Sequence, residues 1–485
     1  MRIIGNDQTK TRETSATASG TLPNGKPVVV NSDGTVSAVS ETIVNPAFGT
    51  KAQFESGNTS QHASAYDSTN SKVVFVYSDD DNNNYGTACV GDVDPSNNSI
   101  SFGTPVVFQG AAALNNRIGA TFDSNAGKIV ISYQGTSNYG TAIVGTVSGT
   151  SISFGTPVVF ESSNTYEPLI DFDTNTNKCL IMYNKNSAFG EAIVGTVSGT
   201  SISFGSPATF WAYNCSNYDL AYDTNAARFL LAFRDDNQSD GYGKGVVATI
   251  SGTSVNFSTV VQYVAGSTWD TACSYDSDNQ VVLVFYRNAY VSDYCQATIG
   301  TISGNAVSFS TPDTVISSNL RNLRAVYDPV GQKTILGFRE NVSPRYGQLK
   351  PITLSGTTFT VGSTATFNAA QTTDFSEVYA SSDGRVVFGF KDGGNGGRGN
   401  AIVYNAGSTT RNLTAENYIG TASSPATDGD SVVVNTQGTV DDNQTGLTAG
   451  QSYYVQNDGT LSTTAGDPSV FAGTAVSSTK LIVKG

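Results

Sequence analysis

Side chains that could carry acid–base or nucleophilic chemistry are scarce in this chain of 485 residues. His62 is the single histidine, so any Ser–His–Asp or Cys–His nucleophile system would have to use it. No GxSxG elbow or cysteine-protease signature accompanies it. We therefore interpret His62 as a loop residue at the start of a strand, and histidine-dependent hydrolysis is disfavoured.

The cysteines do not form a metal or redox motif. None is spaced as CxxC, and an odd number scattered along the chain does not make a disulfide framework. Cys89 occupies a repeat position that Ile143 and Ile193 hold elsewhere, which predicts a small apolar filler in a sheet. We expect neither a metal nor another cofactor. The cysteines are Cys89, Cys179, Cys215, Cys273 and Cys295.

An aspartate follows an aromatic residue at one recurring position, which could suggest a ring of carboxylates for metal or acid chemistry. A catalytic acid, however, is needed once or twice and not six times. Each aspartate directly precedes a polar turn, where a carboxylate can accept backbone N–H bonds. We predict this turn role, with weak calcium binding as the alternative. The residues are Asp67, Asp123, Asp173, Asp223, Asp276 and Asp328.

A positive charge recurs where the second predicted strand of a repeat ends. The residue is basic in the last four of seven repeats and uncharged in the first three. Four adjacent cations would form a basic crescent, which suggests a site for an anionic ligand such as an acidic glycan. The alternative, which we favour, is local pairing with Asp235, Glu340 and Asp392, because paired surface charges are common. The four cations are Arg234, Arg287, Arg339 and Lys391.

The loops that follow these strands are the candidate binding loops. They differ from repeat to repeat while the strands do not, and binding usually resides in divergent loops on a constant scaffold. Their aromatic, arginine and Asx side chains suit sugar recognition and protein contacts alike. The candidate tyrosines are Tyr85, Tyr242, Tyr290 and Tyr346.

These side chains are positioned by an internal repeat. Residues 139–160 recur at 189–210 with 17 of 22 positions identical, and weaker copies surround them. An aromatic landmark begins a polar turn and an apolar run at intervals of 50 to 56 residues. Each unit predicts four strands, which is typical of a propeller blade, so we predict an all-β, seven-bladed β-propeller. The landmarks are Tyr66, Phe122, Phe172, Tyr222, Tyr275, Tyr327 and Tyr379.

The last repeat lacks its fourth strand, and the missing strand is found before the first repeat. Residues 48–54 resemble residues 154–160, so we predict that they complete the seventh blade and close the ring. Short repeated VVVN-type segments outside the ring predict β-hairpins. The expected organisation is a flexible arm or docking segment (1–15), an N-terminal hairpin segment (16–45), the propeller (46–410) and a small C-terminal β domain (411–485).

Composition and charge exclude several classes of function. The chain has 50 glycines and a formal charge of −14, with 26 basic against 40 acidic residues. A general nucleic-acid binder needs a surplus of lysine and arginine, and an acidic chain does not dock on anionic membranes. The sequence shows no apolar run of the length of a signal peptide or a membrane span. We expect no nucleic-acid partner, no membrane insertion and no export signal.

The repeats GTVSGTSISFGTPVVF, the opening VVVNSDGTVS and the closing AGQSYYVQNDGTLSTTAGDPSVFAGTAVSSTKLIVKG resemble virion structural proteins of tailed phages, especially marine ones. The resemblance covers almost the whole chain. It implies a tail-fibre, tail-associated or capsid-attached protein, with other virion proteins as partners and the virion as location after assembly in the host cytoplasm. It transfers no catalytic residues.

We therefore expect a non-enzymatic virion protein that displays binding loops to a host-surface glycan or a neighbouring virion subunit. One alternative is a glycan-active enzyme of the sialidase or lyase type, although the SxDxGxxW box is not present and Ser381-Ser-Asp-Gly-Arg resembles it only superficially. The other is a bacterial lectin or adhesin. A monomer and a homo-oligomer fit the sequence equally well.

Overall fold

The computed structural model describes residues 12–110, 117–237 and 241–484. Within these residues the regular elements are strands, apart from two short 3-10 helices at Thr136–Asn138 and Gly393–Asn395, which confirms the all-β prediction. None of the described segments forms a helix long and apolar enough to cross a bilayer. The chain divides into a unit of residues 45–407 and a second unit that combines residues 1–44 with 408–485.

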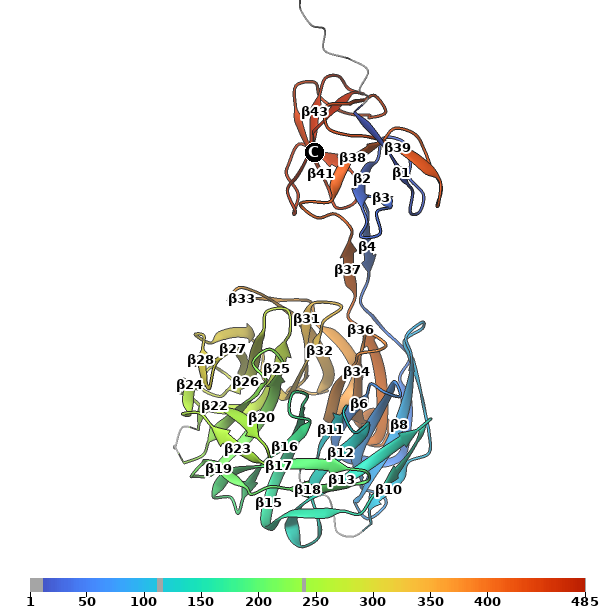
Figure 1. The fold of residues 1–485 in the computed structure, drawn as a ribbon. Helices are drawn as coiled ribbons and strands as arrows, with labels where there is room; N and C mark the ends of the chain where they lie inside the picture. The colour runs from blue at the N-terminus through green and yellow to red at the C-terminus, as the bar shows by residue number, and fades with distance from the viewer. Residues whose placement is uncertain (1–11, 111–116, 238–240, 485) are drawn as a thin grey trace, which may run out of the picture. The chain divides into compact units, whose positions relative to one another are not determined.

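The larger unit is the predicted seven-bladed propeller (Figure 1). In each blade strands a, b and c are consecutive antiparallel neighbours. The a strands line the centre of the ring and are β11 (Gly119–Asp123), β20 (Cys215–Asp223), β25 (Thr268–Asp276), β30 (Leu320–Asp328) and the second halves of β6 (Ala52–Asp67), β15 (Val158–Asp173) and β34 (Ala365–Ala380).

Strand b is the most buried strand of each blade, because it is packed on both faces against neighbouring blades and is continuously apolar. The b strands are β7 (Lys72–Asp79), β12 (Lys128–Gln134), β16 (Lys178–Lys185), β21 (Arg228–Asp235), β26 (Val281–Asn288), β31 (Lys333–Glu340) and β35 (Arg385–Asp392). The c strands are β8 (Tyr85–Asp94), β13 (Tyr139–Ser148), β17 (Phe189–Ser198), β22 (Tyr242–Ser251), β27 (Tyr294–Ser303), β32 (Tyr346–Ser355) and β36 (Arg398–Asn405).

The predicted fourth strand is split into two pieces that both pair with strand c. In blade four, β23 (Ser254–Phe257) pairs with the end of β22 and β24 (Val261–Val264) pairs with its beginning. The other first pieces are β5 (Ala47–Phe48), β9 (Ser99–Phe102), β14 (Ser151–Phe154), β18 (Ser201–Phe204), β28 (Ala306–Phe309) and β33 (Thr358–Val361). The other second pieces are β10 (Val106–Gln109), β19 (Ala208–Trp211), β29 (Asp313–Ile316) and the first halves of β6, β15 and β34.

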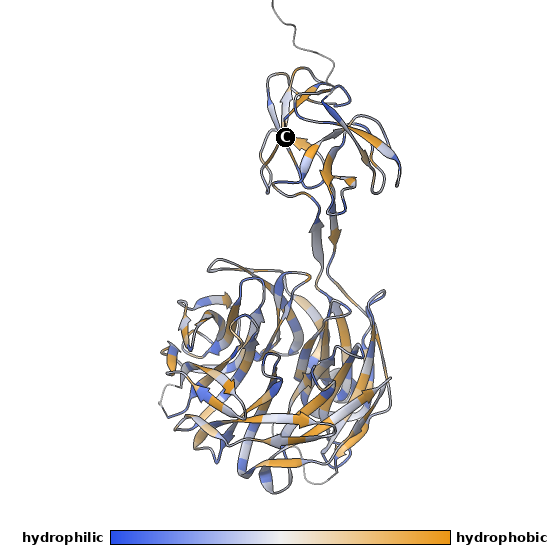
Figure 2. Cartoon of the chain, viewed as in Figure 1, coloured by the Kyte–Doolittle hydropathy of each residue, from blue (hydrophilic) through white to orange (hydrophobic). Residues whose placement is uncertain are grey.

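An aromatic pair joins the outer strand of one blade to strand b of the next blade at six of the contacts between blades. The ring centres lie between 5.2 and 5.4 Å apart, within the range of favourable aromatic contacts. Figure 2 shows hydrophobic (orange) stretches within the strands of the propeller. The pairs are Phe54–Tyr77, Phe108–Tyr133, Phe160–Tyr183, Phe210–Phe233, Tyr263–Tyr286 and Phe367–Phe390.

The ring closes as the sequence predicts. Phe48 in β5 is the register partner of Tyr404, and Ala52 in β6 is the partner of Ala401, so the chain before the first blade supplies the outer strand of the seventh. Phe54 then packs against Phe75 of the first blade, with parallel rings 5.0 Å apart. The closing strand is therefore built into the core on both of its sides.

The break in the outer strand requires glycine in several blades. A Cβ at Gly155 would lie 1.8 Å from the carbonyl oxygen of Thr200, in the c–d turn of the next blade. Gly103 and Gly205 meet the corresponding carbonyls at the same distance, and Gly49 of the closing strand is closer still to Asn98. Backbone of one blade thus contacts backbone of the next at a point where only glycine fits.

The second unit is assembled from both ends of the chain. One sheet has the order β1–β39–β38–β2–β3 and the other β40–β44–β43–β41–β42, while β4 pairs with β37. The strands are β1 (Glu13–Thr17), β2 (Pro27–Val30), β3 (Val36–Ala38), β4 (Glu41–Val44), β37 (Ser408–Arg411), β38 (Tyr418–Ala422), β39 (Ser431–Asn435), β40 (Val440–Asp441), β41 (Ser452–Val455), β42 (Leu461–Ser462), β43 (Val470–Ala475) and β44 (Leu481–Val483).

The terminal predictions were right in part. The hairpins β2–β3 and β41–β42 form, but β39 and β40 do not pair, because β1 and β38 already occupy both edges of β39. Of the predicted arm (1–15), residues 1–11 lie outside the described residues, while residues from Glu13 onward belong to β1. The division falls at 44/45 and 407/408, where we had placed it at 45/46 and 410/411.

Candidate binding site on the propeller

The residues that the sequence singled out for chemistry are structural. The landmark aspartates hold their turns as predicted; for example, Asp67 Oδ1 accepts hydrogen bonds from the backbone N–H groups of Thr69 and Asn70, both at 3.0 Å. The five cysteines are free and buried, in agreement with their interpretation as apolar fillers. Among the described residues, no cluster of three or more histidine, cysteine or carboxylate side chains could hold a metal ion.

His62 is not a loop residue, so that prediction was wrong. It lies within β6 and is 7% exposed, and its Nε2 is 2.9 Å from the Thr59 hydroxyl. Burial, together with the positive charge of Lys391, lowers the pKa of His62 to about 3. The imidazole is therefore neutral around pH 7.

Three of the four predicted cations lie at the ends of their b strands and are paired with acids. Arg234 Nε donates to Asp236 at 2.6 Å, and Lys391 Nζ lies 3.4 Å from Asp80. Arg287 Nε donates to Asp270 at 2.9 Å, and its Nη1 contacts Asp293.

The partners that we had favoured are not used. Asp235 pairs with Lys244 at 2.8 Å and Asp392 with Lys51 at 2.5 Å. Adjacent residues on a strand point to opposite faces, so a cation and the acid directly after it cannot pair.

Arg339, the fourth cation, differs from the others. Its Nε and Nη1 are buried and have no hydrogen-bond partner among the described residues. Burial is the main cause that lowers its pKa, followed by the charge of Arg345. Because the other three cations are paired with acids, the predicted basic crescent is largely neutralised.

The four predicted tyrosines belong to four different blades. Tyr85, Tyr242 and Tyr346 are the first residues of β8, β22 and β32 and are partly buried. Tyr290 lies in the loop between β26 and β27 and is 62% exposed. The structure therefore does not gather the four into one cluster.

Two of the predicted cations instead contact a tryptophan that sequence reasoning did not single out. The Arg234 guanidinium lies 3.9 Å from the centre of the Trp269 ring, and that of Arg287 lies 5.4 Å away. The other tryptophan of the chain, Trp211, is covered in the same way by Lys244 at 4.0 Å. Such cation–π contacts hold the cations in fixed positions.

A ring of polar residues is built into the a strands. Where strand a shifts its register against strand b, one extra residue forms a bulge, five residues before the aromatic landmark. Six of the bulge residues have φ between +46° and +57°, a conformation uncommon for residues other than glycine and enriched at functional sites. The ring consists of Gln61, Arg117, Glu167, Asn217, Asp270, Asn322 and Asp374, of which Arg117 does not share the positive φ.

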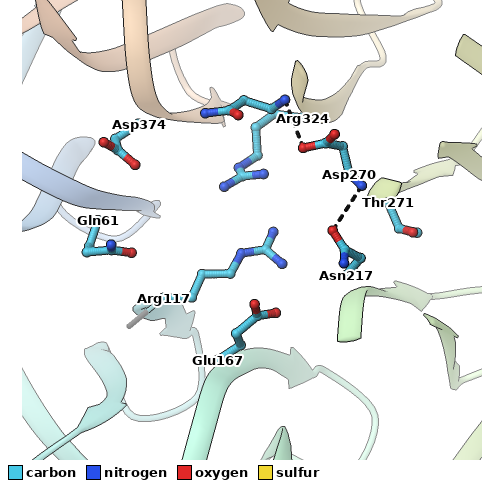
Figure 3. A pocket seen from close by; sticks show the side chains of 9 residues that line it. Gln61, Arg117, Glu167, Asn217, Asp270, Thr271, Arg324 and Asp374 are labelled. Atoms are coloured by element: carbon cyan, nitrogen blue, oxygen red, sulfur yellow. Dashed lines mark hydrogen bonds between the residues drawn. The ribbon is translucent and has the colours of Figure 1, made fainter. Parts of the chain in front are cut away.

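These seven residues, with Thr271 and Arg324, line a cavity of about 270 Å³ at the centre of the propeller. Figure 3 shows the guanidinium groups of Arg117 and Arg324 directed into the cavity from opposite walls, with Glu167 beside Arg117. Every lining side chain is polar. The cavity, named the central pocket below, can therefore offer hydrogen-bond donors and acceptors from all sides.

Hydrogen bonds fix part of this wall. Asp270 donates its N–H to Asn217 Oδ1 at 3.2 Å, and its Oδ1 accepts the N–H of Asn322 at 3.0 Å. Its Oδ2 accepts from Arg287, one of the predicted cations. Arg287 thus orients a pocket residue from outside and does not face a ligand itself.

A second cavity of about 160 Å³ is lined by the same two arginines together with buried acids. Burial raises the pKa of Asp171 to about 6, and it raises the pKa values of Asp219 and Glu377 as well. Burial and the charge of Arg117 lower the pKa of Arg324 to about 10. The second cavity thus holds carboxyl groups that are easily protonated beside two guanidinium groups.

The sequence contains a signal for the central pocket. The position five residues before the landmark is polar in all seven repeats, although the apolar core of the blade follows directly. The position combines constant polarity with varying side-chain chemistry and lies within a strand, whereas the predicted binding residues lie at strand ends and in loops.

No protein-family model matches the chain, and no curated protein matches it. Among solved structures, the BP39L lectin from Burkholderia pseudomallei has a TM-score of 0.57 at 9% identity, covering 74% of this chain and 98% of the lectin. Sqt1 from Saccharomyces cerevisiae has a TM-score of 0.42 at 9% identity, covering 74% and 99%. At these identities the likeness to the lectin concerns the fold.

Proposed function

We propose that this chain is a non-enzymatic structural protein of a tailed-phage virion, whose propeller binds a glycan of the host surface. The observation that carries the binding role is the central pocket. Seven blades each contribute one polar side chain at the same position, and these side chains alternate between amide, guanidinium and carboxylate. A sugar presents hydroxyl groups that both donate and accept, so such a wall complements it.

The chemistry of the pocket supports a sugar more than an apolar ligand. No aromatic or aliphatic side chain is among its lining residues, so there is little apolar surface to bury. The polar groups are held by strands and by bonds such as that between Arg287 and Asp270, which reduces the entropy lost on binding. A protein of the same fold, the Burkholderia lectin, is a carbohydrate binder by name.

The virion role rests on the sequence resemblance to tailed-phage structural proteins. The second unit is the candidate for attachment to a neighbouring virion protein. One of its two five-stranded sheets combines strands from both chain ends, and the unit forms a compact cluster of its own. If the second unit attaches the protein to the virion, the propeller is left to bind the glycan.

A glycan-active enzyme is the second candidate, because raised carboxyl pKa values beside a cavity are typical of catalytic acids. Asp171 fits this description, with a pKa of about 6. Its two oxygens, however, accept the backbone N–H groups of Phe172 at 2.8 Å and Tyr222 at 3.2 Å, so the carboxyl group already holds backbone of its own blade and of the next. His62, with its pKa of about 3, is a poor general base.

Immunogold electron microscopy tests the virion role. Antibodies against the purified chain are applied to purified particles of the phage that encodes it. We expect gold at a fixed position on the tail or the capsid. Particles that stay unlabelled, while the chain is recovered free in the lysate, would refute the proposal.

A further inference from the structure

Arg117 and Arg324 are the two positive charges of the central pocket, and neither is neutralised by an ion pair. Among the described residues, no carboxylate oxygen lies within 4.0 Å of either guanidinium. Each donates through Nη1 to a backbone carbonyl at 2.8 Å, Arg117 to Tyr218 and Arg324 to Leu323. A guanidinium has five N–H donors, so most of them remain for a ligand.

The two arginines act on each other. Arg117 is among the causes that lower the pKa of Arg324, although Asp219, Asp270 and Glu377 act in the opposite direction. Bringing two like charges together in a partly buried space costs free energy unless an anion lies between them. The pocket therefore holds two like charges close together, beside the carboxyl groups of Glu167, Asp270 and Asp374 that also line it.

Two of the neighbouring acids, Asp270 and Glu377, do not fill this role. Both oxygens of Asp270 are engaged, one by Arg287 and one by the N–H of Asn322. Both oxygens of Glu377 are buried without a hydrogen-bond partner among the described residues, and burial raises its pKa well above the ordinary value. A protonated Glu377 is a donor and does not repel an anion.

We infer that the central pocket accepts the carboxylate of an acidic sugar, held between Arg117 and Arg324; this rests on the glycan-binding function proposed above. Guanidinium groups bind carboxylates through two parallel N–H···O bonds, which gives both affinity and orientation. The pocket, at about 270 Å³, has room for one sugar unit. The amides of Gln61, Asn217 and Asn322 then face the hydroxyl groups of that unit.

The test measures the affinity of the full chain for oligogalacturonate by isothermal titration calorimetry, beside its carboxyl-reduced form, in which each carboxylate has become a hydroxymethyl group. We expect the acidic form to bind at least tenfold more tightly. Arg117→Gln and Arg324→Gln should each weaken binding of the acidic form at least tenfold and weaken binding of the reduced form by a clearly smaller factor. Dextran sulfate and dextran form a further pair that separates a sulfate site from a carboxylate site.

Arg228→Gln is the matched control, because it removes the same charge from the a–b turn of blade four, where Arg228 bonds to the carbonyls of Ala226 and Ala227. It should not change the affinity. Circular dichroism checks that each variant is folded. If a pocket variant does not fold, competition on the unmodified chain replaces it: free galacturonate should displace the oligomer and galactose should not.

Equal affinity for the acidic and reduced forms would overturn the inference and leave the glycan-binding function intact. Binding of dextran sulfate with none of oligogalacturonate would overturn the carboxylate in favour of a sulfate ester. Failure to bind any of the four carbohydrates would count against the proposed function itself.

Discussion

At the scale of single residues, the central pocket depends on side chains that occupy an unfavourable backbone conformation. Glu167 has φ +48° and Asp374 has φ +46°, where a residue other than glycine costs about 1–3 kcal/mol. The same position could have been recognised in the sequence by its constant polarity. The direction of the side chains could not be predicted, because the bulge that turns them into the central pocket arises from pairing with strand b.

Asp171 supplies a prediction about pH. Its pKa is raised from 3.8 to about 6, so the folded state holds the proton more tightly than the unfolded state. The stabilisation from this group is therefore complete below pH 4 and is lost as the pH rises through 6. Asp171→Asn has no ionisable group at this position, so its stability does not change with this titration. Between pH 4 and pH 7 the free energy of unfolding of the wild type should fall relative to the variant by up to about 3 kcal/mol.

Urea titrations of the two proteins at both pH values measure this difference. A constant offset between them, caused by the altered hydrogen bonds to Phe172 and Tyr222, does not affect the comparison. Parallel pH profiles would show that Asp171 titrates normally in the folded chain.

At the scale of elements, the sequence predicted strands a, b and c and the turn aspartates because these follow from local chemistry. It did not predict that the fourth strand is split into two pieces. That break is set by the neighbouring blade: Gly155 lies against the carbonyl of Thr200, a contact 45 residues away in sequence. The failed β39–β40 hairpin has a similar cause, since β1 takes the edge that a hairpin partner would need.

Gly155→Ala tests the contact between blades. The added Cβ would meet backbone, which cannot rotate away, so we expect the free energy of unfolding to fall by about 1–3 kcal/mol. Gly110→Ala is the control, because no atom of the described residues lies within 4 Å of a Cβ there. Denaturant midpoints of the two variants should differ clearly. Equal midpoints would mean that the blades can separate at this turn without cost.

At the scale of the whole molecule, the number of blades and the closure of the ring could be predicted because both are properties of the repeat. The pocket could not, since it exists only where seven blades meet. No single repeat contains it, and its nine lining residues are drawn from all seven blades. The VVVN-type segments at both chain ends suggested that the N-terminal hairpin contributes to the second unit, but the pairing of β1 with β39 could not be predicted, because pairing across more than 400 residues leaves no local pattern.

Ring closure gives the prediction at this scale. A fragment of residues 45–407 retains β5 and β6 and should melt cooperatively. A fragment of residues 56–407 lacks Phe54 and exposes the edge of β36. Loss of the Phe54 side chain alone should lower the free energy of unfolding by about 3–5 kcal/mol. This fragment should melt at least about 10 °C lower, or without a cooperative transition. Indistinguishable melting curves by circular dichroism would show that the propeller does not need its closing strand.

The central claim is that the propeller binds a glycan without cutting it. Size-exclusion chromatography of the full chain with fluorescent polygalacturonate, alginate and polysialic acid tests it most directly, followed by release of the polymer and measurement of its length. We predict that at least one polymer co-elutes with the protein and is recovered at its original length. Shortened polymer would identify an enzyme, and no co-elution with any of the three would contradict glycan binding.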